Sequence, residues 1–271
     1  MNAATFAAGT APRPLPELIF AVVGAARAGT AALQSALDGH PQARCMGDVL
    51  SDCDQVRRLV HESFYGPAPP GAASAHCSND PISPGNPERY LEAHVFRAPF
   101  ELKAFGVKLT YEQLAHYDLW DYLADKLRQG SFCLVHLVRN PLMCSLSWAR
   151  ARLRRSWYLP AGSSARPSSV SLPGLTDEGQ QALLQSVRDH EARQLRLERL
   201  GADRFDLSYR RLCRQPSDAW RAVCDYLELP PCAGLQPRTR KLDEPSRLAL
   251  TAMTAGAPAE VRRYLQDPEM Y

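Results

Sequence analysis

The chain has 271 residues, a formal net charge of +3 at pH 7, 45% hydrophobic and 23% charged residues. These values are ordinary for a globular protein with a buried core, and the small charge argues against a nucleic-acid partner. No segment approaches the roughly 20 apolar residues that cross a membrane, and the N-terminus shows no secretory signal pattern. None of the eight cysteines forms a CxxC pair that would suggest zinc. We therefore expect a cytoplasmic protein without a membrane span or a metal site.

The first third of the chain predicts one strand and two helices between irregular segments. Residues 1–16 are rich in Ala, Pro and Thr and are expected to be a flexible N-terminus. Residues 18–23 form a continuous apolar run, which predicts a strand buried on both faces. Helices are predicted over 30–37 and 52–64, and a long loop over 65–89, which is rich in Gly, Pro, Ser and Asn.

The middle of the chain repeats the strand–helix alternation. Strands are predicted over 105–110 and 131–138, and a helix over 111–129 between them. Pro141 suits a first helical turn, so a helix is predicted from 141 to about 155. Residues 158–176 form a second long loop of low complexity.

The last third adds one more strand and three helices, with the strand over 204–207. Helices are predicted over 178–200, 217–227 and 259–265. Buried strands that alternate with helices indicate an α/β fold with a central parallel sheet flanked by helices. We expect one domain over residues 17–271, with its two long loops as insertions.

A phosphate-binding loop is predicted directly after the first strand. Its sequence is Gly24-Ala-Ala-Arg-Ala-Gly29-Thr30, and it leads into a helix. Backbone amides of such a turn and the helix N-terminus favour an anion, and the side chains of Arg27 and Thr30 add donors. A glycine turn that binds nothing is the other interpretation of this segment. No lysine follows Gly29, and the strand over 132–138 leads into Arg139 rather than into Asp, which disfavours a magnesium-dependent kinase.

A second strand–turn–helix segment, HLVRNPLMCSLSWAR over 136–150, provides the other half of the predicted site. Arg139 ends the strand, and Ser147 lies about one and a half turns into the helix. Ligands of parallel sheets bind outside the carboxyl ends of the strands, so both loops should face one crevice. The Arg139 guanidinium could there bind a second phosphate. Trp148, in the same helix, could be a core residue or a flat surface for the substrate, and we expect the core.

The two motifs together resemble those of the PAPS-dependent sulfotransferases. The resemblance is carried by strand-GxxRxGT-helix followed by strand-RNPxxxxxS-helix, and it implies the P-loop-like three-layer fold of that family. It also implies that the first motif binds the 5′-phosphosulfate of 3′-phosphoadenosine 5′-phosphosulfate (PAPS), through Ala26, Arg27, Ala28, Gly29, Thr30 and Ala31. The second motif, with Arg139 and Ser147, would bind the 3′-phosphate. The usual PRSGT or PKSGT reads AARAGT here, so Ala28 replaces the serine.

Further segments are similar to the bacterial carbohydrate-type members of this family. FGVKLTYEQL (105–114) resembles their VKL strand, and RFDLSYRRL (204–212) resembles a segment whose tyrosine, here Tyr209, lies near the adenine. RKLDEPSRLAL, which begins at Arg240, resembles their closing segment and implies that Arg240 belongs to the cofactor site. The likeness extends from about residue 17 to the end of the chain.

The resemblance implies transfer of a sulfuryl group from PAPS to a hydroxyl or amine of a small-molecule or carbohydrate acceptor, leaving 3′-phosphoadenosine 5′-phosphate (PAP). No metal is expected. Arg27 would act as an electrostatic clamp. Lys108 would lie near the reacting centre, although it could also be an ordinary lysine at a strand end. Asp48, after Gly47, takes the place of a carboxylate that acts as general base, although it could equally cap a helix or lie on the surface. Asp52 and Glu112 are further candidates for the base.

The sequence is also compatible with two other functions. One is a P-loop kinase or NTPase, which needs a Walker lysine and a magnesium carboxylate that the sequence does not offer in place. The other is a degenerate nucleotide-binding module that keeps the loops and has lost the chemistry. The acceptor is expected to be selected by the loops over 65–89 and 158–176, since specificity resides in loops on a common scaffold.

Overall fold

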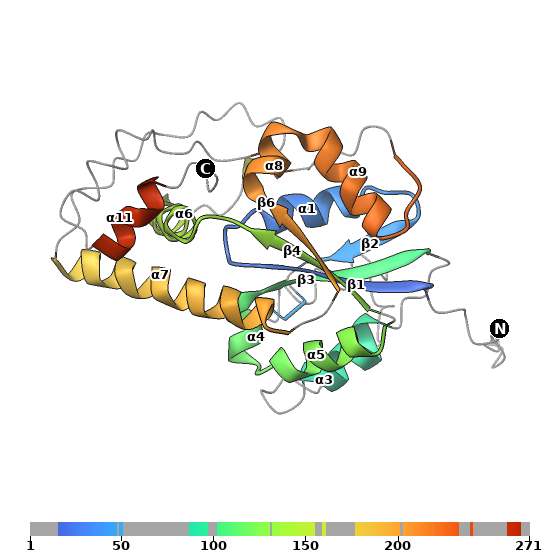
Figure 1. Ribbon diagram of the computed structural model, residues 1–271. Helices are drawn as coiled ribbons and strands as arrows, with labels where there is room; N and C mark the ends of the chain where they lie inside the picture. Colours follow the sequence, from blue (N-terminus) through green and yellow to red (C-terminus); the bar gives the residue numbers. More distant parts are fainter. Residues whose placement is uncertain are drawn as a thin grey trace, which may run out of the picture.

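Five parallel strands form the central sheet of the computed structural model (Figure 1). The residues that the structure describes are 16–47, 49–50, 87–96, 102–130, 132–154, 159–160, 177–200, 203–232, 239–240 and 259–266. The strand order across the sheet is β2-β3-β1-β4-β6. The strands are β1 (Leu18–Gly24), β2 (Ala43–Met46), β3 (Ala104–Thr110), β4 (Phe132–Val138) and β6 (Arg204–Ser208).

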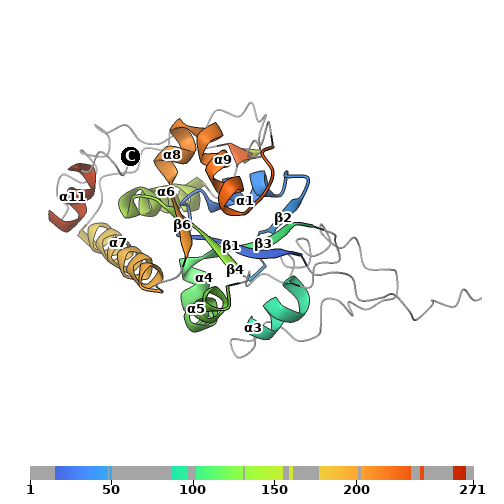
Figure 2. The same ribbon diagram turned by 45° about the vertical axis from the view of Figure 1, so that its right-hand side comes forward.

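Helices cover both faces of the sheet, and two views agree on their sides (Figures 1 and 2). One face carries α1 (Thr30–Leu37), α8 (Tyr209–Arg214) and α9 (Pro216–Tyr226), with a core that includes Leu33, Trp220 and Val223. The opposite face carries α3 (Pro87–Tyr90), the π-helical turn η1 (Leu91–Val95), α4 (Tyr111–His116) and α5 (Trp120–Arg128). The sheet between these two layers confirms the predicted three-layer α/β fold.

A third cluster of helices lies beyond the carboxyl ends of the strands (Figure 1). It consists of α6 (Pro141–Arg154), α7 (Asp177–Glu198) and α11 (Ala259–Gln266), which share a small core containing Leu146, Val187 and Val261. A two-stranded antiparallel sheet joins β5 (Leu159–Pro160) to β7 (Thr239–Arg240). Within the described residues no helix is both long and apolar enough to span a bilayer.

The parallel register brings the functional segments to one edge of the sheet. Gly24, at the end of β1, is paired with Thr110 of β3 and with Leu137 of β4. Parallel strands present their carboxyl ends on the same side, so the turns after β1, β3 and β4 lie at one edge of the sheet. The sequence prediction of a shared edge for both phosphate motifs is therefore confirmed.

Some predicted elements differ from the observed ones. The single helix expected over 111–129 is two helices, because Asp118 between them has a φ of 50° and breaks the helical ladder. The short elements β2 and α8 were not predicted, and α3 begins at Pro87, inside the predicted loop over 65–89. The helix expected over 52–64 lies outside the described residues.

Candidate phosphate-binding site

The turn between β1 and α1 has the geometry of an anion-binding loop. Gly29 precedes α1 with a φ of 97°, and its carbonyl accepts the first helical bonds from the N–H groups of Ala32 and Leu33, at 3.0 and 3.2 Å. The amides of Gly29, Thr30 and Ala31 therefore precede the helical ladder and belong to the positive end of the helix. Thr30 is 4% exposed, and its position at the start of α1 places its hydroxyl group at this end.

Arg27 adopts a left-handed conformation within the turn. Its φ is 71°, a conformation that costs a non-glycine residue about 1 kcal/mol or more. Contacts at both ends of the residue hold it in place. Its carbonyl oxygen accepts a hydrogen bond from Nη1 of Arg139 at 2.5 Å, and its Nε donates to Oγ of Ser147 at 3.3 Å. The predicted residues of the two phosphate motifs are thus in direct contact.

Arg139 lies between the first motif and α8. It is 8% exposed at the end of β4, and its guanidinium carbon is 4.1 Å from the ring centroid of Tyr209. The Tyr209 ring also packs against Gly29, since a Cβ built on that glycine would lie 2.7 Å from the ring. A stacked guanidinium retains its charge and its edge donors. Tyr209, predicted to lie near the adenine, thus supports both phosphate motifs from one side.

A carboxylate contacts the loop from the helix α4, which directly follows the neighbouring strand β3. Oε2 of Glu112 accepts a hydrogen bond from the backbone N–H of Ala26 at 3.1 Å. Glu112 lies in the first turn of α4, which begins with a capping box between Thr110 and Gln113. The sequence included Glu112 among the candidates for the base but gave no reason to expect this contact, which depends on the pairing of β1 with β3.

The other predicted site residues are placed as follows. Lys108 is 3% exposed in β3 and, by strand alternation with the core residues Val107 and Leu109, lies on the α1 face of the sheet. Ala28 is fully buried within the turn. Arg240 pairs through its backbone with Leu159, and its side chain is not described. Asp48 and Asp52 lie outside the described residues.

A hydrogen-bond chain runs from the buried Tyr111 through the buried His136 to the exposed Asp206. The Tyr111 hydroxyl lies 2.5 Å from Nε2 of His136, and Nδ1 of His136 lies 2.7 Å from Oδ1 of Asp206. Burial raises the pKa of Tyr111, so its hydroxyl stays protonated. The hydrogen bond from His136 lowers the pKa of Asp206. Both ring nitrogens of His136, which lies within β4, are therefore engaged.

Trp148 departs from its predicted place in the core. It directly follows Ser147 in α6 and is 40% exposed, which makes it one of two large apolar side chains exposed among the described residues. In the sequence, the only signal that this indole lies at the site is its position beside a phosphate motif. An exposed indole next to Ser147 provides a flat apolar surface at the rim of the site.

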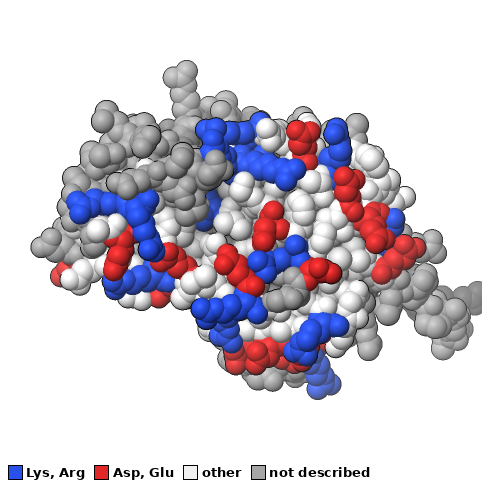
Figure 3. Space-filling view, viewed as in Figure 1, with Lys and Arg blue, Asp and Glu red and all other residues white. Residues whose placement is uncertain are grey.

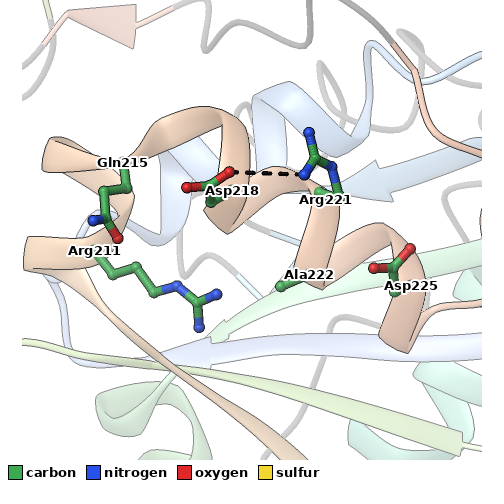
Figure 4. A pocket seen from close by; sticks show the side chains of 6 residues that line it. All are labelled: Arg211, Gln215, Asp218, Arg221, Ala222 and Asp225. Carbon is green, nitrogen blue, oxygen red and sulfur yellow. Dashed lines mark ion pairs between the residues drawn. The ribbon is translucent and has the colours of Figure 1, made fainter.

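Charged side chains also gather on helices outside the candidate site. Arg210, Arg211 and Arg214 lie on α8, and positive side chains gather over that helix in Figure 3, whereas both signs alternate over α7. A depression on α8 and α9 is lined by polar side chains of both charges, including the ion pair of Arg221 with Asp218 at 3.9 Å (Figure 4). In the part of the chain that the structure describes, no cluster of His, Cys, Asp and Glu could hold a metal ion.

Comparison with known proteins identifies the family. The chain resembles a sulfotransferase from Alicyclobacillus acidocaldarius (17% identity, TM-score 0.48, 93% of this chain and 96% of the other covered). It also resembles the sulfotransferase domain of the Synechococcus PCC 7002 olefin synthase (18% identity, TM-score 0.49, 94% and 86% covered). No curated protein sequence gives a significant match. The model of the sulfotransferase family matches residues 19–232, and since this is most of the sequence, the chain belongs to the sulfotransferase family.

Proposed function

We propose that the chain transfers a sulfuryl group from PAPS to a hydroxyl or amine of a small-molecule or carbohydrate acceptor. The observation that carries this proposal is the contact between the two phosphate motifs, in which Arg139 donates to the Arg27 carbonyl and Arg27 donates to Ser147. A cationic loop of backbone amides and a second turn that carries the Arg139 guanidinium, both at one sheet edge, suit a ligand with two separate phosphate groups. PAPS has this charge pattern, with a phosphosulfate at the 5′ position and a phosphate at the 3′ position.

Each residue of the site is assigned to one part of PAPS by its position. The amides from Ala26 to Ala31, with Arg27 and Thr30, form the set assigned to the 5′-phosphosulfate. Arg139 and Ser147 form the set assigned to the 3′-phosphate. Lys108 adds positive charge from β3, and Arg240 is assigned to the same cofactor site from its sequence position. Tyr209 keeps Arg139 in place by stacking, and the exposed Trp148 offers a surface for a flat ring of the nucleotide or the acceptor.

The chemistry follows from where charge accumulates. The acceptor oxygen or nitrogen attacks sulfur in line, the bond between sulfur and the bridging phosphate oxygen breaks, and its electron pair remains on the phosphate of PAP. The donors around that oxygen stabilise the developing charge without a metal. Arg27 stays protonated and acts as a clamp rather than as an acid. Asp48 is assigned to accept the acceptor's proton, with Asp52 and Glu112 as the other candidates.

A transfer assay tests this proposal. The formation of PAP from PAPS is measured with a panel of alcohols, sugars and amines, in buffer containing either EDTA or magnesium. We expect acceptor-dependent turnover that EDTA does not abolish, and a fall of about 100-fold or more in kcat for Arg27→Ala. Asp48→Asn should lose turnover and Asp52→Asn should retain it. Magnesium-dependent turnover of ATP would contradict the proposal, whereas PAP binding without transfer to any acceptor would indicate a non-catalytic module.

A further inference from the structure

Glu112 places a negative charge in contact with the loop that is proposed to bind an anion. Its Oε2 accepts the Ala26 N–H at 3.1 Å, and its Oε1 lies 3.5 Å from Nη1 of Arg193 on α7. The carboxylate therefore connects the first phosphate motif to a helix that belongs to a different layer of the molecule. The side chain of Glu112 is 45% exposed, so it has room to move away from the loop.

The backbone of Glu112 is much more constrained than its side chain. Thr110 and Gln113 form the capping box that fixes the start of α4. The preceding residue, Tyr111, is 1% exposed and bonded to His136. The backbone that carries the carboxylate is consequently fixed next to the loop. The contact with Ala26 therefore follows from the fold and does not depend on a long mobile segment.

An anionic ligand must compete with this carboxylate. A single N–H makes one strong hydrogen bond, so a phosphate or sulfate oxygen that uses the Ala26 amide has to displace Glu112. A ligand that uses only the neighbouring amides binds beside an ionised carboxylate, and like charges at this range repel each other. In both cases the affinity of the loop for anions is lower than the amides and arginines alone would give.

We propose that Glu112 is an internal competitor that sets the affinity of the phosphate loop, and that Arg193 retains the carboxylate when a ligand displaces it. The identity of the nucleotide rests on the proposed function, whereas the competition applies to any phosphate. For the proposed reaction, the carboxylate weakens the hold on the anionic product and shortens its residence. Glu112 is in this sense an affinity-determining residue.

Calorimetric titration tests the inference with two probes, PAP and inorganic pyrophosphate. Glu112→Gln keeps the length and an acceptor oxygen but removes the charge, and we expect it to bind both probes about 3–10-fold more tightly than the wild type. Asp118→Asn is the matched control, because Asp118 also faces an arginine of α7, Arg196 at 4.0 Å, but is 89% exposed and lies beyond the end of α4. It should bind both probes within about twofold of the wild type.

The outcomes separate the inference from the proposed function. Equal or weaker binding of both probes by Glu112→Gln, in a variant with an unchanged Tm, overturns the inference. If wild-type protein binds PAP no better than pyrophosphate, the nucleotide assignment fails. In that case the affinity of Glu112→Gln for pyrophosphate, compared with that of the wild type, still decides whether the carboxylate competes with anions for the loop. Stopped-flow release of PAP should also be slower from Glu112→Gln, and faster release would contradict the inference.

Discussion

Gly29 shows how one residue couples the loop to the rest of the site. Its φ of 97° is accessible to glycine at little cost, and the missing Cβ leaves room for the ring of Tyr209. The same ring stacks on Arg139, which in turn donates to the carbonyl of Arg27. A side chain at position 29 would therefore disturb at once both segments that are proposed to bind phosphate.

Gly29→Ala is expected to reduce stability more than a glycine substitution with similar backbone strain. Gly130→Ala is the matched control, because Gly130 has a φ of 74° and an added Cβ would meet nothing within 4 Å. Left-handed strain alone costs about 1–2 kcal/mol, and overpacking against Tyr209 adds about 1–3 kcal/mol at position 29. Urea unfolding of both variants measures the difference. Equal losses of unfolding free energy would show that Tyr209 does not restrict this position.

The helices α7 and α4 pack against each other near the carboxyl end of the sheet, and titratable side chains lie at their contact. His190 of α7 is 7% exposed, and its ring lies edge-on to that of Tyr111 at 5.5 Å between centroids. Burial, followed by the charges of Arg193 and His136, lowers the pKa of His190 from 6.5 to about 4. The folded protein therefore holds His190 neutral, and this contact between the helices depends on pH.

The pH dependence of stability follows from that lowered pKa. Between pH 6.5 and about 4 the unfolded chain binds a proton at His190 that the folded chain does not. The free energy of unfolding should rise with pH across this window, by up to about 1.4 kcal/mol per pH unit from this group. His190→Phe, which retains a ring against Tyr111, should lose that part of the slope, and the exposed His116→Gln should keep it. Identical pH profiles for wild type and His190→Phe in urea unfolding would contradict this account.

The elements that the sequence predicted well are those with a strong local signal. The apolar runs of β1, β3 and β4, and the proline at the start of α6, each identify their element without tertiary information. The short strand β2 could not be predicted, because its four residues form a strand only through pairing with β3. The helix α8 has six residues and starts at the side-chain cap of Ser208, a signal too short to separate it from the strand before it.

At the scale of the whole molecule, the site depends on the order of the strands. The two phosphate motifs meet because β1 lies between β3 and β4 in a parallel sheet, and the general rule for such sheets predicted their shared edge. That rule gives no side-chain distances, so the bonds from Arg139 to Arg27 and from Ala26 to Glu112 were not predictable. The prediction that Trp148 lies in the core rests on its hydrophobicity and is wrong. Hydrophobicity alone does not reveal which face of α6 the neighbouring helices cover.

The proposed function requires that both motifs together bind a nucleotide with phosphates at its 3′ and 5′ positions. Thermal unfolding with PAP, compared with 5′-AMP and with ATP–magnesium, tests it most directly in wild type and Arg139→Ala. PAP at about 100 times its Kd should stabilise the wild type by about 2.7 kcal/mol, which is a shift in Tm of several degrees. The account predicts that 5′-AMP gives a smaller shift and that Arg139→Ala loses most of the response to PAP. A response to ATP–magnesium without one to PAP, or an undiminished PAP response in Arg139→Ala, would contradict it.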